Sequence, residues 1–172
     1  MSASTWDPQS APVLRPPAHQ VSRKAIPFWT ARAALGWLVV AAVQVVWMVF
    51  WDKGPAAPHV VGLIVTAAVA ILHLAVMPQW RYRVHRYEIT PDVVYTQSGW
   101  FNIERRVAPI SRIQTVDTKR GPLQQLFGLT DVTVTTASAK GPVEVNGLVA
   151  ADAERLVAEL SSYTRASTGD AT

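Results

Sequence analysis

The chain has 172 residues, a net charge of +4 and no cysteine. The absence of cysteine excludes disulfides, thiolate catalysis, iron-sulfur clusters and Cys-based zinc sites. Residues 1–78 carry five Lys or Arg against two acids, whereas residues 79–172 carry eleven against ten. Because a basic flank beside an apolar run sets the orientation of membrane proteins, we interpret this excess as an orientation signal and expect no nucleic-acid partner.

The first segment, residues 1–28, contains five prolines among small and polar residues. No helical or strand period builds up in it, so the sequence predicts a disordered cytoplasmic tail up to about Ala25. The alternative is a secretory signal peptide whose apolar core is 33–51. That run is longer than the usual core of about 7–15 residues, which favours a membrane span.

Two apolar runs, at about 33–51 and 60–77, contain no Lys, Arg, Asp or Glu. At a rise of ~1.5 Å per residue they would span roughly 28 and 27 Å as helices, close to the ~30 Å of bilayer hydrocarbon. The sequence therefore predicts a transmembrane hairpin over 29–78. Basic residues precede the first run and follow the second, which places both termini in the cytoplasm and the protein in the plasma membrane.

The polar side chains inside the two apolar runs lead to two separate hypotheses, one for Gln44 and Thr66 and one for His73. Gln44 and Thr66 lie at similar depths, about 10 and 9 Å from the outer ends, so we expect a hydrogen bond between them. His73 has two interpretations: a proton relay or ligand, or a neutral imidazole near the headgroups. Small residues on both runs offer surfaces for close packing of the two helices: Gly36, Ala41, Ala42, Gly62, Ala67 and Ala70.

Short alternating segments with turn residues between them begin at Gln79 and predict an antiparallel β domain over 79–165, with a flexible tail at 166–172. Six strands are expected, at 80–89, 93–97, 100–107, 113–119, 129–136 and 143–148. Residues 121–128 predict one helical turn whose apolar face, formed by Leu123, Leu126 and Phe127, plugs an end of the β structure. An amphipathic helix at 150–163 should cover the barrel or sandwich.

Basic residues cluster after the second apolar run and again in the third predicted strand. Arg81, Arg83, Arg86, Arg105 and Arg106 are candidates for contact with anionic lipid headgroups. The alternative is that the first three form the ordinary basic flank of a span and the others are solvated strand residues.

Sequence motifs for catalysis are absent. The chain has no glycine-rich phosphate cradle and no GxSxG elbow, and His19, His59, His73 and His85 fall in four separate segments. We therefore expect no enzymatic activity, no cofactor and no metal site.

The order of these segments resembles the bacterial pleckstrin-homology (PH)-like domain family, in its membrane-anchored YdbS/YdbT-like group. The residues that carry the resemblance are 87–99, 109–119, 121–129 and 143–154. It implies an α+β membrane protein in which a two-helix hairpin precedes a PH-like β barrel capped by its C-terminal helix, held at the cytoplasmic face.

A PH-like fold hosts lipid, peptide and protein ligands, so the fold does not choose among them. The preferred hypothesis is a membrane-anchored, non-catalytic interaction module that binds a protein partner or another copy of itself. Two alternatives are an anionic-lipid sensor that uses the basic residues and an accessory subunit of a membrane enzyme or transporter that uses His73.

Overall fold

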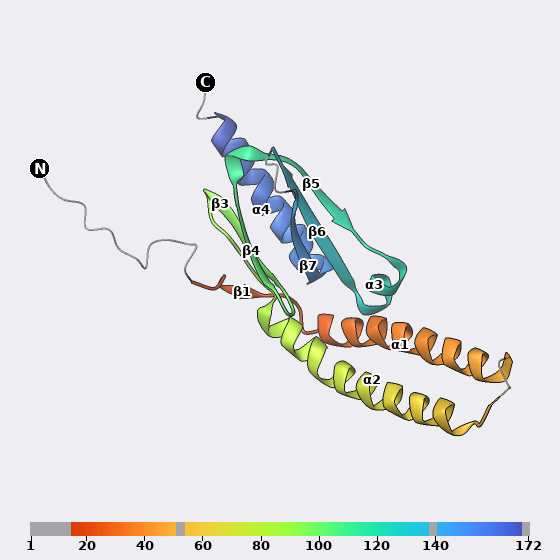
Figure 1. Ribbon diagram of the computed structural model, residues 1–172. Helices are drawn as coiled ribbons and strands as arrows, with labels where there is room; N and C mark the ends of the chain where they lie inside the picture. The colour runs from red at the N-terminus through yellow and green to blue at the C-terminus, as the bar shows by residue number, and fades with distance from the viewer. Residues whose placement is uncertain (1–14, 51–53, 138–140, 170–172) are drawn as a thin grey trace, which may run out of the picture. The chain divides into compact units, whose positions relative to one another are not determined.

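A computed structural model describes residues 15–50, 54–137 and 141–169 of the chain (Figure 1). The chain divides into two compact units. The hairpin unit is Ile26–Trp80, and the β unit combines Arg81 onward with the residues that lead up to Ala25. The hairpin is therefore inserted within the sequence of the β unit.

The hairpin unit contains most of α1 (Ala25–Phe50) and of α2 (Ala57–Val84), whereas the last turn of α2, from Arg81, belongs to the β unit. Both helices are long and apolar enough to cross a membrane. Each extends beyond the predicted span, because Pro27 lies in the first turn of α1, where proline is tolerated, and Pro78 does not end α2. The predicted end of the first span at residue 51 lies outside the described residues.

The less exposed residues of the two helices recur every seven positions, as in two helices packed along a left-handed seam. On α1 they include Ala34, Trp37, Ala41, Gln44 and Met48, and on α2 they include His59, Leu63, Thr66, Ala70, His73 and Met77. Gly36 and Gly62 do not mark places of close packing, because a Cβ added at either would meet no atom within 4 Å. The expectation that these two glycines bring the helices close is wrong.

The β unit contains two antiparallel sheets. The first has the order β1 (His19–Gln20), β2 (Arg86–Ile89), β3 (Val93–Gly99), β4 (Ile103–Pro109), and the second has the order β5 (Ile113–Lys119), β6 (Leu129–Thr136), β7 (Val143–Val149). A 3-10 turn, η1 (Ile110–Arg112), joins the sheets. Short helix α3 (Pro122–Phe127) joins β5 to β6, and α4 (Ala150–Gly169) follows β7.

The core lies where α4 packs against both sheets. Ala153, Leu156 and Leu160 of α4 are buried together with Val94 of the first sheet and Val132 of the second. Burying a side chain of this size contributes about 1.5–3 kcal/mol, so this cluster supplies the main driving force for folding of the β unit. The predicted α+β architecture, with a C-terminal helix covering a β sandwich, is confirmed.

Two predicted strand boundaries are wrong. The segment predicted as a strand from residue 80 is helical through Val84, so Arg81 and Arg83 lie on the last turn of α2. The strand predicted over 93–97 continues through Gly99, so the break expected at 98–99 before the next strand falls after β3 instead. Gly99 has φ 129°, and a Cβ there would lie 1.8 Å from the Asn102 carbonyl oxygen, so glycine is required.

The tail predicted to be disordered over 1–28 is structured from residue 15 onward. His19 pairs with Tyr87 of β2, Pro17 and Val21 are buried, and the Ser22 amide donates to the Gly147 carbonyl at 3.1 Å. The local pattern did not reveal this segment, because its hydrogen-bond partners lie far away in the sequence. Residues 1–14 lie outside the described residues.

Candidate functional site

The C-terminal end of α2 is capped by the β unit. A helix leaves its last carbonyls without intrahelical donors, and here two of them find other partners. The His85 amide and ring Nδ1 both contact the Arg81 carbonyl, at 2.9 and 2.8 Å, and Gln97 Nε2 on β3 donates to the Val84 carbonyl at 3.1 Å. Arg105 Nε in turn donates to Gln97 Oε1 at 2.9 Å. The end of α2 is thus tied to the first sheet.

His85 is neutral in this arrangement. Burial, together with the charge of Arg81, lowers the pKa of His85 from 6.5 to about 4. A carbonyl only accepts, so the contact to Arg81 requires the proton on Nδ1. The imidazole therefore acts as a donor that caps the helix, which is a role that the sequence did not indicate.

Residues 15–18 bind the outer face of the first sheet. Arg15 forms an ion pair with Glu88, and the Ala18 amide donates to the same carboxylate at 3.0 Å. The Tyr95 hydroxyl donates to the Arg15 carbonyl at 2.9 Å, and Arg86 Nη1 donates to the Pro17 carbonyl at 3.4 Å. The segment that precedes α1 is therefore an integral part of the β unit.

A half-buried carboxylate, Asp131, organises the second sheet at a β-bulge between Thr130 and Val132. It accepts from the Gly147 amide at 2.8 Å and from Gln124 Nε2 at 2.6 Å, and Gln124 Oε1 accepts from the Gly121 amide at 2.7 Å. Burial raises the pKa of Asp131, although both hydrogen bonds oppose that shift. The sequence signal for this bulge is the isolated Gly147 inside a strand pattern, and its φ is 83°.

The predicted basic cluster is split by strand alternation. Neighbouring residues of a strand point to opposite faces, so the side chains of Arg105 and Arg106 leave β4 on opposite faces of the first sheet. Arg86 and Arg105 flank Gln97 in one row across β2, β3 and β4, close to the end of α2 that carries Arg81 and Arg83.

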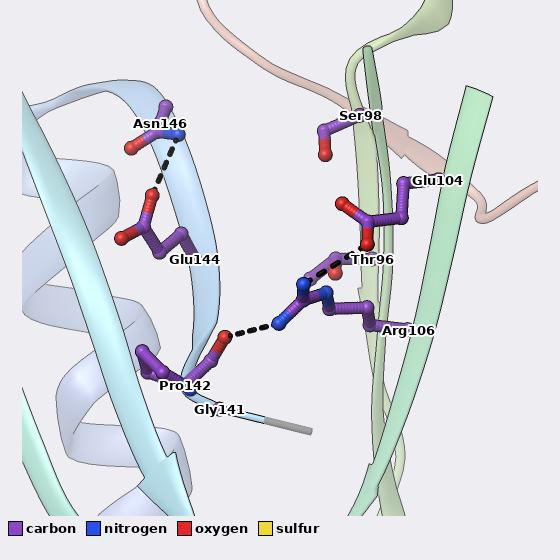
Figure 2. Close-up of a pocket in the computed structure, with 8 residues that line it drawn as sticks. All are labelled: Thr96, Ser98, Glu104, Arg106, Gly141, Pro142, Glu144 and Asn146. Atoms are coloured by element: carbon purple, nitrogen blue, oxygen red, sulfur yellow. Dashed lines mark hydrogen bonds and ion pairs between the residues drawn. The ribbon is translucent and has the colours of Figure 1, made fainter. Parts of the chain in front are cut away.

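Arg106 is on the inner side, where it bridges the two sheets across a cleft of about 350 Å³ (Figure 2). Its Nη1 donates to the Pro142 carbonyl at 2.9 Å, and its Nη2 pairs with Glu104 at 2.9 Å. On the far wall, Asn146 Nδ2 donates to Glu144 at 3.4 Å. With two carboxylates and one arginine, this cleft is unsuited to an anionic headgroup.

A larger cleft of about 730 Å³ shares Arg106 with the first and runs along β4. Its lining includes Arg105, Arg106 and Arg112, with Glu104 as the one acid, and the half-exposed apolar side chain of Val107. In the described part of the chain, β4 and β7 each have one hydrogen-bonded strand neighbour, so the cleft follows a free strand edge. A strand edge lined with basic and apolar groups is suited to an extended peptide.

The hairpin contains two polar pairs on its seam. Gln44 Nε2 donates to Thr66 Oγ1 at 2.8 Å, which is the pair that depth along the helices indicated. Trp37 Nε1 donates to His73 Nδ1 at 3.0 Å, seven residues away on both helices. The sequence did not identify Trp37 as a partner of His73.

Metal ligands do not come together in the residues that the structure describes, where no group of three His, Asp or Glu side chains could hold an ion.

Comparison with known proteins agrees with this architecture. The family model described as "Bacterial PH domain" matches residues 31–164. The chain is 30% identical over 163 residues to the UPF0699 transmembrane protein YdbS of Bacillus subtilis strain 168, covering 90% of this chain and 97% of that protein. No solved structure matches the chain. The chain is a membrane protein whose described residues include two transmembrane helices, and it belongs to the bacterial PH domain family.

Proposed function

We propose that this protein is a non-catalytic interaction module of the plasma membrane. Its hairpin holds the PH domain at the cytoplasmic face, with both termini on that side, and the domain binds an extended segment of a protein partner or of a second copy along β4. The observation that carries the proposal is the larger cleft, where a free strand edge is lined by three arginines and one acid.

An extended segment would gain main-chain hydrogen bonds from β4 and charge complementarity from the arginines. Arg106 is already engaged with Glu104 and Pro142, so Arg105 and Arg112 supply most of the available charge. The favoured ligand is therefore an extended stretch with acidic residues. Because the hairpin confines the domain to the membrane, weak affinity suffices for partners in the same membrane.

Photo-crosslinking in native membranes tests this proposal. A photoreactive amino acid replaces Val107 in the cleft, and the matched control replaces Gln114, an exposed residue of β5 outside that cleft. We expect a discrete protein adduct from position 107 that is lost in Arg112→Ser, and none from position 114. Equal labelling at both positions, or none at 107, would contradict the proposal, and an adduct of twice the mass of the chain would identify a second copy.

A second candidate function is recognition of anionic lipid, supported by Arg81, Arg83, Arg86 and Arg105 around the end of α2. Each exposed basic residue at such a surface adds about 1 kcal/mol of attraction that salt screens. Reconstitution into anionic and zwitterionic nanodiscs separates the two functions. If the mobility of the PH domain falls in anionic nanodiscs at low salt but not in zwitterionic ones, the result favours lipid recognition.

A further inference from the structure

We infer that the PH domain also docks on the bilayer through apolar side chains of two loops at the end where α2 enters the domain. We call Phe101, Ile103 and Leu126 the apolar tip. Phe101 and Ile103 belong to the β3–β4 turn and the start of β4, and Leu126 belongs to α3. This inference does not depend on the proposed function, because the tip is separate from the larger cleft along β4.

The apolar tip is exposed to an unusual degree. Phe101 is 84% exposed, Leu126 is 82% exposed and Ile103 is 53% exposed. The Trp100 ring lies edge-on to Phe101 with ring centroids 4.2 Å apart, so the turn presents aromatic surface. The expectation that Leu126 helps to plug the β structure is wrong, because Leu126 points into solvent. Large apolar side chains that are this exposed are unfavourable in water unless they serve a binding surface.

The β3–β4 turn lies at the α2 end of the domain. Gln97 pairs with Arg86, the first residue of β2, and Gln97 also caps Val84 at the end of α2. Since β2 runs away from α2 and β3 returns, the residues after Gln97 extend beyond the start of β2, on the side from which α2 arrives. Phe101 is therefore at the end of the β unit where Arg81–Val84, the last turn of α2, lies.

The α3 loop lies at the point where α1 departs. Gly128 ends α3 in the left-handed conformation, and a Cβ at Gly128 would lie 3.8 Å from Lys24 Nζ. Lys24 directly precedes the first residue of α1, Ala25. Within the β unit, Figure 1 shows α3 and the β3–β4 turn at the same end. Both parts of the apolar tip thus lie where the chain enters and leaves the hairpin.

The length of chain between span and domain makes the bilayer the favoured occupant. The apolar run ends at Met77, and the seven helical residues from there to Val84 cover only about 10 Å, within reach of the headgroup layer. No charged residue occurs in 99–103 or 122–127. Aromatic and aliphatic side chains without charge are suited to the membrane interface, where one end of a ring is apolar and the other wet.

Single-cysteine labelling of the full chain in nanodiscs tests the inference. Because the natural chain has no cysteine, a label reacts only at the introduced position. An environment-sensitive fluorophore is placed at Phe101→Cys and, separately, at Leu126→Cys. The matched control is Ala158→Cys, an exposed position of α4. We expect nitroxide-labelled lipid to quench the two tip positions several-fold more than the control, and a soluble quencher to act mainly on the control.

The lipid dependence separates apolar docking from attraction of the basic residues. Quenching at the tip should persist in zwitterionic lipid and at high salt, because it does not rely on charge. Soluble quencher reaching positions 101 and 126 as readily as 158 would overturn the inference. So would shielding that appears only when two copies share a nanodisc or a second protein is added, since these outcomes identify a protein as the occupant. Asn102→Cys provides a second label in the turn should labelling at 101 perturb it.

Discussion

The side-chain amide of Gln97 donates to the carbonyl of Val84 at 3.1 Å, so a strand of the PH domain caps the helix that emerges from the membrane. Replacing Gln97 by Met removes the donor and leaves the Val84 carbonyl and Arg105 Nε without this partner. We expect a loss of about 1–3 kcal/mol in the free energy of unfolding. Chemical unfolding of the detergent-solubilised chain measures it, with exposed Gln114→Met as the unaffected control.

His85 should make stability depend on pH. Its pKa is lowered from 6.5 to about 4 in the fold, so between these values the unfolded chain binds a proton that the folded chain does not. The free energy of unfolding is therefore not reduced by His85 above pH 6.5. It falls as the pH drops towards 4, by on the order of 3 kcal/mol at most.

The measurement for His85 is the free energy of unfolding against pH for the natural chain and for His85→Gln. Asp131, whose pKa is raised, contributes the opposite slope and is common to both proteins, so the difference between them isolates His85. Parallel curves for the two proteins over pH 4 to 6.5 would contradict the assignment.

The segment before α1 should detach when its anchor is removed. Glu88 binds both Arg15 and the Ala18 amide, so Glu88→Ala removes two contacts of that segment. We expect amide hydrogen exchange to rise in residues 15–22 while the α4 core, around Leu156, keeps its protection. Glu154→Ala, at an exposed position of α4, is the control, and an unchanged exchange rate in the segment would show that Glu88 does not hold it.

Glycines should differ sharply in their tolerance to substitution. Gly99→Ala places a Cβ 1.8 Å from the Asn102 carbonyl oxygen at a φ of 129°, so we expect a loss of at least about 2 kcal/mol. Gly36→Ala in α1 meets no atom within 4 Å, so stability should stay constant or rise by up to about 1 kcal/mol. Thermal unfolding of the two variants gives the comparison, and similar losses at both positions would argue against the turn geometry.

The hydrogen bond between Gln44 and Thr66 should be weak. Bonds between helices in bilayers are worth about 0.6 kcal/mol on average, because the separated helices also find partners. A double-mutant cycle with Gln44→Leu and Thr66→Val measures the coupling through hairpin unfolding in mixed micelles. A coupling indistinguishable from zero would mean that the 2.8 Å contact adds nothing to stability.

Several parts of the fold were predictable because their pattern is local. Strands β5 and β6 have the predicted bounds, since alternation and flanking turn residues are visible within a short window. The Gln44 to Thr66 pair followed from helix rise alone. The helical end of α2 was missed, because the aromatic and basic residues from Trp80 to Arg83 also fit a strand, and the caps that hold them helical, His85 and Gln97, act through tertiary contact.

The candidate site was less predictable than the fold. Arginines 105 and 106 were grouped by sequence proximity, whereas the pleat of β4 sends one towards Gln97 and the other towards Pro142. The apolar tip was not recognised either. Phe101 and Leu126 have the composition of core residues, and only their position decides their exposure.

The sequence by itself determined the two membrane helices, the β character of the remainder and the covering helix, because each depends on hydrophobic period and length within one segment. Tertiary structure decided the rest: that residues 15–25 complete the β unit, that a strand caps α2, and that the apolar tip lies where the chain enters and leaves the hairpin. These features arise from contacts between segments distant in sequence, which no local pattern encodes.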